Sequence, residues 1–130
     1  MQHELQTAMQ DQVGIVRRED EMRTALETID RLRSRAERVR VHGNREYNPG
    51  WHTALDLRHM LTVSEAITRA AIERRESRGA QFREDHAEKD PVFGKINIVV
   101  RKGTDGRMVV AREPVPPMSD EQRAIIEEMK

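Results

Sequence analysis

Hydrophobic residues recur every three or four positions in three long stretches of the sequence, at about residues 2–13, 18–40 and 51–77. This spacing places apolar side chains on one face of an α-helix and charged side chains on the other. The three apolar stripes comprise Leu5, Ala8, Met9 and Val13; Met22, Ala25, Leu26, Ile29, Leu32, Ala36 and Val39; and Trp51, Ala54, Leu57, Met60, Leu61, Ser64, Ile67, Ala70 and Ala71. Because short connections join the three stretches, the pattern predicts a mainly α fold. Its core is an antiparallel up-and-down three-helix bundle, similar to a spectrin repeat.

Residues that favour helix ends separate these stretches. The run His-Gly-Asn at 42–44 is predicted to end the second helix, because glycine and asparagine tolerate the left-handed backbone of a helix C-terminus. Asn48 is the predicted N-cap of the third helix, and Pro49 is its first residue. Gly79 is predicted to stop the third helix.

The remaining part of the chain has a different pattern. Two runs rich in β-branched residues, 96–100 and 108–111, flank a turn that contains an Asp-Gly pair, which is typical of a β-hairpin. A Ser-x-x-Gln capping box at 119–122 then opens a short helix that is predicted to reach about Met129.

These elements predict how the chain is organised. We expect residues 1–90 to form the three-helix bundle. We expect residues 91–130 to form a β-hairpin and C-terminal tail packed on that bundle. Helices should then account for about half of the residues or more, above the usual third.

Charged residues make up 35% of the chain, above the usual quarter, which suits narrow helices with wide solvated faces. The 23 basic and 23 acidic residues balance along the whole length, whereas a nucleic-acid-binding surface is usually basic on one side, so no nucleic-acid partner is expected. The absence of cysteine excludes disulfides and thiolate metal sites. No apolar run reaches about 18 residues and the first residues do not resemble a signal peptide, so no direct membrane insertion is expected.

Motifs for nucleotide binding are absent from the sequence. No two of the seven glycines are separated by a single residue, which excludes the dinucleotide-binding fingerprint. His52, Asp56 and His59 share one helix face, but two helical turns, about 10.5 Å, separate the histidines. Polar residues on a solvated face are far commoner than a metal site in this arrangement. We therefore predict no catalytic, cofactor-binding or metal-ligating residue in this chain.

The densest polar segment, residues 74–85, lies where the third helix is predicted to end. The last carbonyls of a helix lack intrahelical partners, and arginine side chains can bind them. Two interpretations stay open: the segment closes the helix within this domain, or it docks against another part of a larger protein. If it docks, Arg78→Ala should destabilise the full-length protein but hardly the isolated fragment. The docking hypothesis takes as interface residues Glu76, Ser77, Arg78, Gly79 and Arg83.

The same segment carries a family resemblance. Residues 76–80, followed by 83–85, resemble the "ESRGAH-x-RED" stretch of succinate dehydrogenase and fumarate reductase flavoprotein subunits. Residues 9–17 are similar to that family's "MQ…GI-x-R" segment, residues 54–61 to its "LxLxNML" helix and residues 106–115 to its "GKV…RPV" strand. The four matches occur in the family's order along most of the chain.

The flavoproteins of this family contain a FAD-binding domain, a capping domain and a C-terminal helical domain, and this chain resembles only the last. The resemblance implies FAD in the parent subunit, none in this fragment, and succinate–fumarate interconversion by domains absent here. The implied partners are the FAD-binding and capping domains of the same subunit and an iron–sulfur subunit, in a complex on the cytoplasmic, inner face of a bacterial membrane. The fragment alone is expected neither to bind FAD tightly nor to oxidise succinate. Gln81 stands where the family usually has histidine, so no role that needs an imidazole carries over.

Two alternatives stay open. L-aspartate oxidases share the "ESRG" helix end, but their helical domain generally finishes soon after it, whereas about 45 residues follow here, which favours succinate dehydrogenase. The other alternative is a free-standing helical interaction module without a redox role. An encoding frame that extends several hundred codons upstream would favour the flavoprotein, and a frame of about this length would favour the module.

Overall fold

The structure is a computed structural model that describes residues 1–129. Its α-helices are α1 (Gln2–Gln12), α2 (Glu19–Ala36), α3 (Pro49–Glu73) and α4 (Asp120–Glu128). Its strands are β1 (Val16–Arg17), β2 (Phe82–Arg83), β3 (Ile96–Lys102) and β4 (Met108–Pro114), and a 3₁₀ turn, η1, covers Phe93–Lys95. About half of the residues are helical, so the predicted mainly α fold, with its bundle, hairpin and C-terminal helix, is confirmed.

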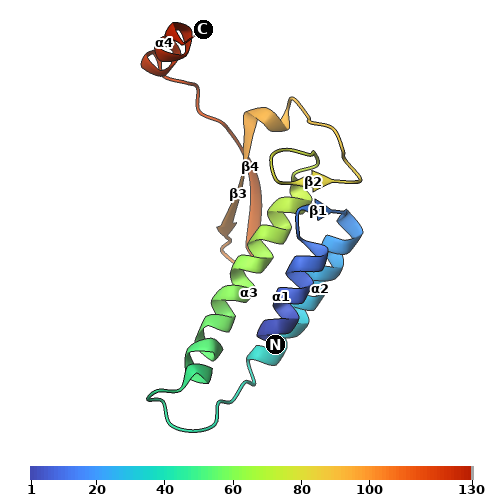
Figure 1. Cartoon of the computed structure of the whole chain (residues 1–130), viewed down its shortest axis with the longest axis vertical. Helices are drawn as coiled ribbons and strands as arrows, with labels where there is room; N and C mark the ends of the chain where they lie inside the picture. The colour runs from blue at the N-terminus through green and yellow to red at the C-terminus, as the bar shows by residue number, and fades with distance from the viewer. Residues whose placement is uncertain (130) are drawn as a thin grey trace.

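Helices α1, α2 and α3 lie side by side, each antiparallel to the one before it, and form the bundle (Figure 1). Their apolar stripes meet in two buried clusters. One cluster contains Leu5, Ile29, Leu32, Leu57 and Leu61, and the other contains Val13, Met22, Ala25 and Ala71. All nine residues belong to the stripes predicted from the sequence, so the three-to-four-residue spacing identified the core face of each helix.

Two predicted helix ends are wrong by about four residues. Helix α2 ends at Ala36 rather than near residue 40, because its last turn tightens: Val39 N donates to the carbonyl of Ala36, three residues back, at 3.3 Å. Helix α3 ends at Glu73 rather than near residue 77, and Gly79 does not stop it. Arg74 leaves the helical conformation, with φ −81° and ψ 94°, and a side chain from a later segment binds the last carbonyls.

The start of α3 is as predicted. Asn48 Oδ1 accepts a hydrogen bond from Gly50 N at 3.1 Å, and Pro49 is the first helical residue. The amide of Asn48 also donates to the carbonyls of His42 and Asn44, which folds the preceding loop against the helix end. This helix terminus is therefore built from residues within a short span of sequence.

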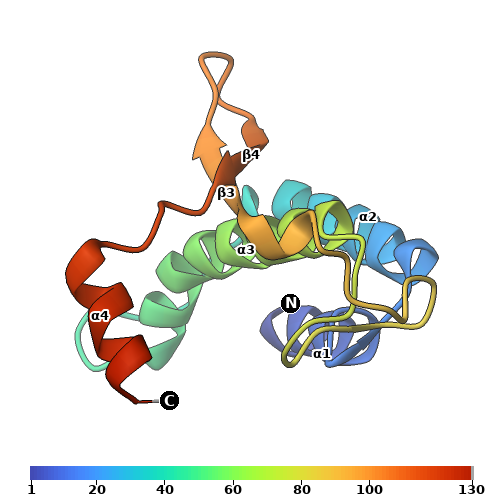
Figure 2. The same ribbon diagram turned by 90° about the horizontal axis from the view of Figure 1, so that it is seen from above.

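Strands β3 and β4 form the predicted hairpin, with Ile96 opposite Pro114 and Lys102 opposite Met108. Each strand has seven residues and extends beyond its β-branched run. The turn contains Gly106 with φ 81°, a conformation that glycine adopts without steric cost. The hairpin packs on α3, where Arg112 Nε lies 2.6 Å from Glu73 Oε1, and its tip projects away from the bundle (Figure 2).

A short parallel pair of strands was not predicted. β1 follows α1, and β2 lies in the irregular segment after α3, with Val16 opposite Phe82 and Arg17 opposite Arg83. The pair joins two segments that are more than sixty residues apart in the chain. It therefore fixes the segment after α3 against the α1–α2 connection.

Helix α4 begins with the predicted capping box, in which Ser119 and Gln122 bond each other's backbone N–H groups. It contains no buried residue and stands apart from the bundle (Figure 1). Residues 91–129 are thus of two kinds: the hairpin packs on α3, whereas the helix that follows it does not. The division of the chain at residue 90 stays a prediction. None of the helices in residues 1–129 combines the length and the apolar character needed to cross a membrane.

Candidate functional site

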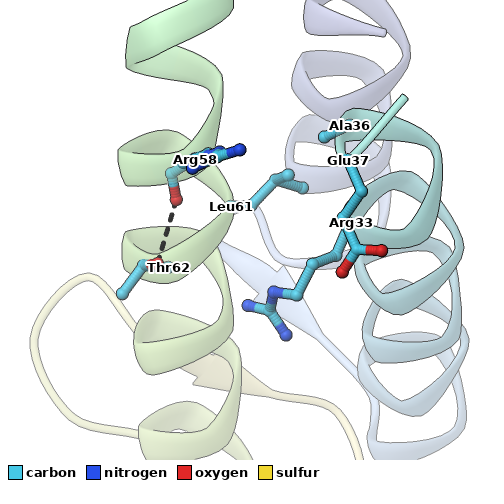
Figure 3. A pocket seen from close by; sticks show the side chains of 6 residues that line it. All are labelled: Arg33, Ala36, Glu37, Arg58, Leu61 and Thr62. Atoms are coloured by element: carbon cyan, nitrogen blue, oxygen red, sulfur yellow. Dashed lines mark hydrogen bonds between the residues drawn. The ribbon is translucent and has the colours of Figure 1, made fainter. Parts of the chain in front are cut away.

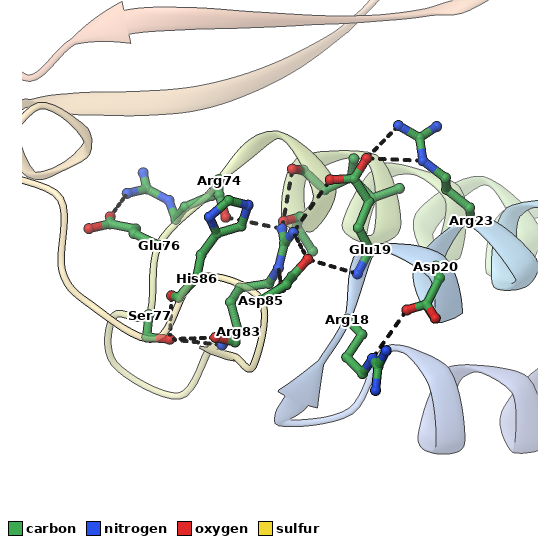
Figure 4. Close-up of polar contacts among 12 residues, drawn as sticks. Arg18, Glu19, Asp20, Arg23, Arg74, Glu76, Ser77, Arg83, Asp85 and His86 are labelled. Atoms are coloured by element: carbon green, nitrogen blue, oxygen red, sulfur yellow. Dashed lines mark hydrogen bonds and ion pairs between the residues drawn. The ribbon is translucent and has the colours of Figure 1, made fainter.

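Arg83 lies at the centre of the polar segment after α3 and is completely buried. Its Nη1 donates to the carbonyl oxygens of Ala71, Ile72 and Arg74 at 3.0, 3.3 and 3.4 Å. The carbonyls of Ala71 and Ile72 belong to the last turn of α3, which has no intrahelical partners for them, and that of Arg74 follows directly after the helix. The guanidinium of Arg83 therefore serves as the C-cap of the helix (Figure 4).

The other edge of the same guanidinium binds Asp85. Nε and Nη2 of Arg83 each lie 2.7 Å from a carboxylate oxygen of Asp85, a bidentate pair. Asp85 Oδ2 also accepts the backbone N–H of Glu19, the first residue of α2, at 3.1 Å. The hydrogen bonds from Arg83 hold the pKa of Asp85 well below its usual range. Arg83 and Asp85 together connect the end of α3 to the beginning of α2.

Glu76 is the second fully buried charge of the segment. Its Oε1 accepts from Arg78 Nε at 2.8 Å and from Arg74 Nη1 at 2.6 Å, and its Oε2 accepts from Arg78 Nη2 and from the backbone N–H of Asp90. The bonds from Arg78, then those from Asp90 and Arg74, lower the pKa of Glu76 to about 2. Glu76 therefore stays ionised and holds the two flanking arginines in place.

Arg74 and Ser77 connect this cluster to the chain that follows. Arg74 donates to the carbonyl oxygens of Phe93 and Ile96 at 3.1 and 3.0 Å, at the base of the hairpin. Ser77 Oγ accepts the backbone N–H of Arg83 at 2.8 Å and lies 2.9 Å from the carbonyl oxygen of His86, to which it donates. The segment after α3 is thus held by side chains, since it contains little regular secondary structure.

Gln81 takes part in the same network with both ends of its amide. Its Oε1 accepts from Arg17 Nη1 at 2.7 Å, and its Nε2 donates to the carbonyl oxygens of Arg74 and Glu76 at 2.9 and 3.2 Å. A neutral side chain that accepts at one end and donates at the other satisfies all three groups. The glutamine at this position therefore has a structural role in this chain.

The five proposed interface residues fall into two groups. Glu76 and Arg83 are buried within the domain, and Ser77 is half-buried, so their observed contacts are internal. Arg78 and Gly79 are exposed, and Gly79 has φ 60° in a turn that Arg78 and Gln81 close with reciprocal backbone hydrogen bonds. A role for the segment at an interface stays a prediction.

Sequence reasoning missed the partners that complete the network: Arg17, Glu19, Gln81 and Asp85 as structural ligands of the segment. Asp85 and Gln81 lie inside the dense polar run, so composition could have pointed to them. Arg17 and Glu19 are more than sixty residues away, and only the β1–β2 pairing brings them close.

Two groups of residues within 1–129 contain side chains of the types that bind metal ions. His52, Asp56 and His59 are all exposed on α3, as expected of a solvated face. Glu19, Asp85 and His86 bring potential ligand atoms within 4.8 Å of one another. Both carboxylates are engaged by arginine, because Asp85 binds Arg83 and Glu19 binds Arg23 at 2.6 Å. Their oxygens therefore act here as partners of cations on the protein itself.

A groove lies between α2 and α3, lined by Arg33, Ala36, Glu37, Arg58, Leu61 and Thr62 (Figure 3). Arg33 binds the buried Glu65 at 2.6 Å, and Arg69 binds the other oxygen of that carboxylate at 2.7 Å. Burial raises the pKa of Glu65, but the hydrogen bonds from Arg69 and Arg33 outweigh it and keep the pKa below its usual value. The Arg33–Glu65 ion pair therefore links α2 to α3, and the Arg69–Glu65 pair lies within α3.

Comparison with known proteins identifies the family. The protein-family model that describes the fumarate reductase flavoprotein C-terminal region matches residues 2–123 of this chain. This chain belongs to that family. Its helical bundle and hairpin are therefore those of a fumarate reductase flavoprotein C-terminal domain.

Individual relatives agree with this family assignment. The succinate dehydrogenase flavoprotein subunit of Coxiella burnetii is 34% identical over 126 residues, which is 92% of this chain and 22% of that protein. The fumarate reductase flavoprotein subunit of Haemophilus influenzae is 38% identical over 90 residues, 68% of this chain and 15% of that protein. The solved structure of Mycobacterium smegmatis Sdh1 in complex with UQ1 matches with a TM-score of 0.86 and 39% identity, over 96% of this chain and 22% of that chain. The chain thus spans about a fifth of the length of these proteins.

L-aspartate oxidases also belong among the relatives. The enzyme of Streptomyces coelicolor is 30% identical over 113 residues, 86% of this chain and 19% of that protein. An alignment of that length must extend into β4, well beyond the "ESRG" helix end. The extra length after that motif therefore does not separate the two enzyme types, contrary to the expectation from the sequence.

Proposed function

We propose that this chain is the C-terminal domain of a succinate dehydrogenase or fumarate reductase flavoprotein subunit. In this proposal, domains outside the chain bind FAD and interconvert succinate and fumarate, and this domain supports them structurally. The observation that carries the proposal is the similarity to the Coxiella burnetii succinate dehydrogenase flavoprotein subunit over 92% of the chain. The strong likeness to the Mycobacterium smegmatis Sdh1 structure supports it further.

In this proposal the domain has a structural role and takes no part in the chemistry. The Arg83–Asp85 and Glu76–Arg78 pairs hold the segment after α3 in one conformation, and the exposed Arg78 and Gly79 lie at the contact with the preceding domains of the same subunit. The iron–sulfur subunit of the complex is the electron acceptor. The complex itself lies on the cytoplasmic, inner face of a bacterial membrane.

The deciding experiment uses the full-length flavoprotein encoded by the gene that contains this sequence. Succinate is expected to reduce an artificial dye in the presence of the purified protein, and L-aspartate is not. A flavin absorption spectrum is expected for the full-length protein and not for the 130-residue chain. Turnover of L-aspartate with oxygen would instead identify an L-aspartate oxidase, the alternative that the Streptomyces coelicolor relative favours. An encoding frame of only about this length would favour the free-standing interaction module.

A further inference from the structure

The outer face of the β1–β2 pair is apolar and exposed. In β2 the side chains alternate: Arg83 points inward and is fully buried, whereas Phe82 points outward and is 44% exposed. In β1 Arg17 is half-buried and bound to Gln81, whereas Val16 is 52% exposed. Because Val16 lies opposite Phe82 in register, the two apolar side chains lie side by side on the outer face.

Ile15, the residue before β1, is 67% exposed and extends this surface. We refer to Ile15, Val16 and Phe82 as the ribbon patch. A groove beside Phe82 is lined in part by Arg78, Gly79 and Lys89. A Cβ added at Gly79 would meet nothing within 4 Å, so this part of the surface is open. An apolar centre with a charged rim has the composition of a protein interface.

A ribbon of this kind is seldom left uncovered. Parallel strands occur almost only in sheets with both faces covered, and an isolated two-stranded sheet is marginally stable in water. Here the inner face is covered by the Arg83 network, and no segment of residues 1–129 covers the side chains of the ribbon patch fully. The outer face therefore lacks the cover that such a pair of strands normally has.

We propose that the ribbon patch is the centre of the interface with the part of the flavoprotein polypeptide that precedes this domain. This inference rests on the proposed function. The chain corresponds to 22% of the succinate dehydrogenase flavoprotein subunit that it matches, and the family match is to a C-terminal region, so about four-fifths of such a polypeptide lies before it.

The size of the patch favours a covalently linked partner over a second copy. Stable interfaces between separate proteins bury roughly 800 Å² on each side, more than three partly exposed side chains provide. A domain in the same polypeptide is present at an effective concentration on the order of millimolar, so a smaller apolar centre suffices. The Arg17–Gln81 and Arg83 contacts hold both strands in place, and the internal network therefore presents the patch in a fixed conformation.

Hydrogen exchange tests the proposal without any substitution. Amide exchange of residues 15–17 and 80–84 is compared between the 130-residue chain and the full-length flavoprotein, with the hairpin turn 103–107 as the internal control. We expect exchange at the ribbon to slow by roughly tenfold or more in the full-length protein and exchange at 103–107 to stay unchanged. Equal exchange in both proteins would overturn the proposal. Protection that instead rises with the concentration of the 130-residue chain alone would identify a second copy as the occupant.

Matched substitutions give an independent readout. Phe82→Ser is compared with Val109→Ser, since Val109 is 50% exposed on the hairpin and lies outside the patch. We expect Phe82→Ser to lower the Tm of the full-length protein clearly and Val109→Ser to leave it almost unchanged, with both variants close to wild type in the 130-residue chain. Equal effects of the two variants in the full-length protein would contradict the proposal. The succinate assay tests the proposed function separately from the interface. A wild-type full-length protein that does not oxidise succinate would count against the proposed function. An active protein with equal exchange at the ribbon in both forms would count against the interface only.

Discussion

The two ends of α3 are built in different ways. At the N-terminal end, Asn48 caps the helix through the nearby Gly50, and the loop just before it supplies the remaining contacts. At the C-terminal end, the last carbonyls accept hydrogen bonds from the side chain of Arg83, which belongs to strand β2. One end is thus made by neighbours in sequence and the other by neighbours in space.

The difference predicts unequal sensitivity to substitution. A local N-cap replaces water at one backbone group, so its loss typically costs about 1 kcal/mol. Arg83 is buried and bonds α3, Asp85 and, through Asp85, the start of α2, so its loss leaves several groups without partners.

Arg83→Met is expected to destabilise the domain by about 3–5 kcal/mol, because the carbonyls of Ala71 and Ile72 lose their side-chain donor and the Asp85 carboxylate loses its bidentate cation. Urea unfolding of the 130-residue chain measures this change. Arg101→Met is the control, since Arg101 forms an exposed pair with Glu113 whose loss should cost about 0–1 kcal/mol. Similar losses for the two variants would show that Arg83 is not the tertiary cap.

Glu76→Gln is expected to cost about 2–3 kcal/mol, because the neutral amide leaves Arg74 and Arg78 without their buried anion. Denaturant unfolding at pH 7 measures it, with the exposed Glu84→Gln as the matched control. Arg78→Ala should destabilise the isolated chain, since Arg78 binds Glu76 within this domain, and should destabilise the full-length protein further if Arg78 also lies at the proposed domain contact. If Arg78→Ala leaves the stability of the isolated chain unchanged, the role of Arg78 is confined to the interface.

Stability is expected to fall in acid. The pKa of Glu76 is lowered from 4.5 to about 2 in the folded protein, so its contribution is complete above the unfolded value and is lost as the pH falls from about 5 towards 2. Asp85, whose pKa is also lowered, acts in the same direction. The difference between the unfolding midpoints of wild type and Glu76→Gln should stay constant from pH 7 to about pH 5 and then narrow between pH 5 and pH 3. Parallel pH profiles would show that Glu76 does not contribute to the acid sensitivity.

Asn48→Ala is expected to cost about 1 kcal/mol, the usual effect of losing an N-cap. Asn48→Asp keeps the oxygen that accepts from Gly50 N and should recover most of that loss. Thermal unfolding of the two variants distinguishes the cap from the contacts of the Asn48 amide with the loop. A loss as large as that of Arg83→Met would remove the contrast between the two ends of α3.

Ser119→Ala is expected to change the global stability by less than about 0.5 kcal/mol, although it removes a complete capping box. The reason is that α4 has no buried residue, so its local unfolding is not coupled to the core. The Tm should stay constant while the helical circular dichroism signal falls slightly. A clear drop in Tm would show that α4 packs on the bundle in solution.

Prediction from the sequence worked where the signal is local or periodic. The core stripes of α1, α2 and α3, the Asn48 cap, the Asp-Gly hairpin turn and the Ser119 capping box each depend on residues a few positions apart. The predicted end of α3 was wrong, because Gly79 is a residue type that commonly ends helices but here lies in a separate turn after the helix. The position of that end depends on Arg83, which no local rule connects to the helix.

The helix faces, the hairpin, the resemblance to the flavoprotein family and the dense polar segment 74–85 could all be read from the amino-acid sequence, because each follows from residue spacing or a contiguous motif. The three-dimensional fold was needed to show which charges of that segment are internal, that Arg17 and Glu19 join them, and that Val16 and Phe82 lie side by side. The physical reason is that the β1–β2 pairing brings together residues more than sixty positions apart. Arg83 is buried and its neighbour Phe82 is exposed because side chains alternate along β2, a strand that the sequence pattern does not reveal.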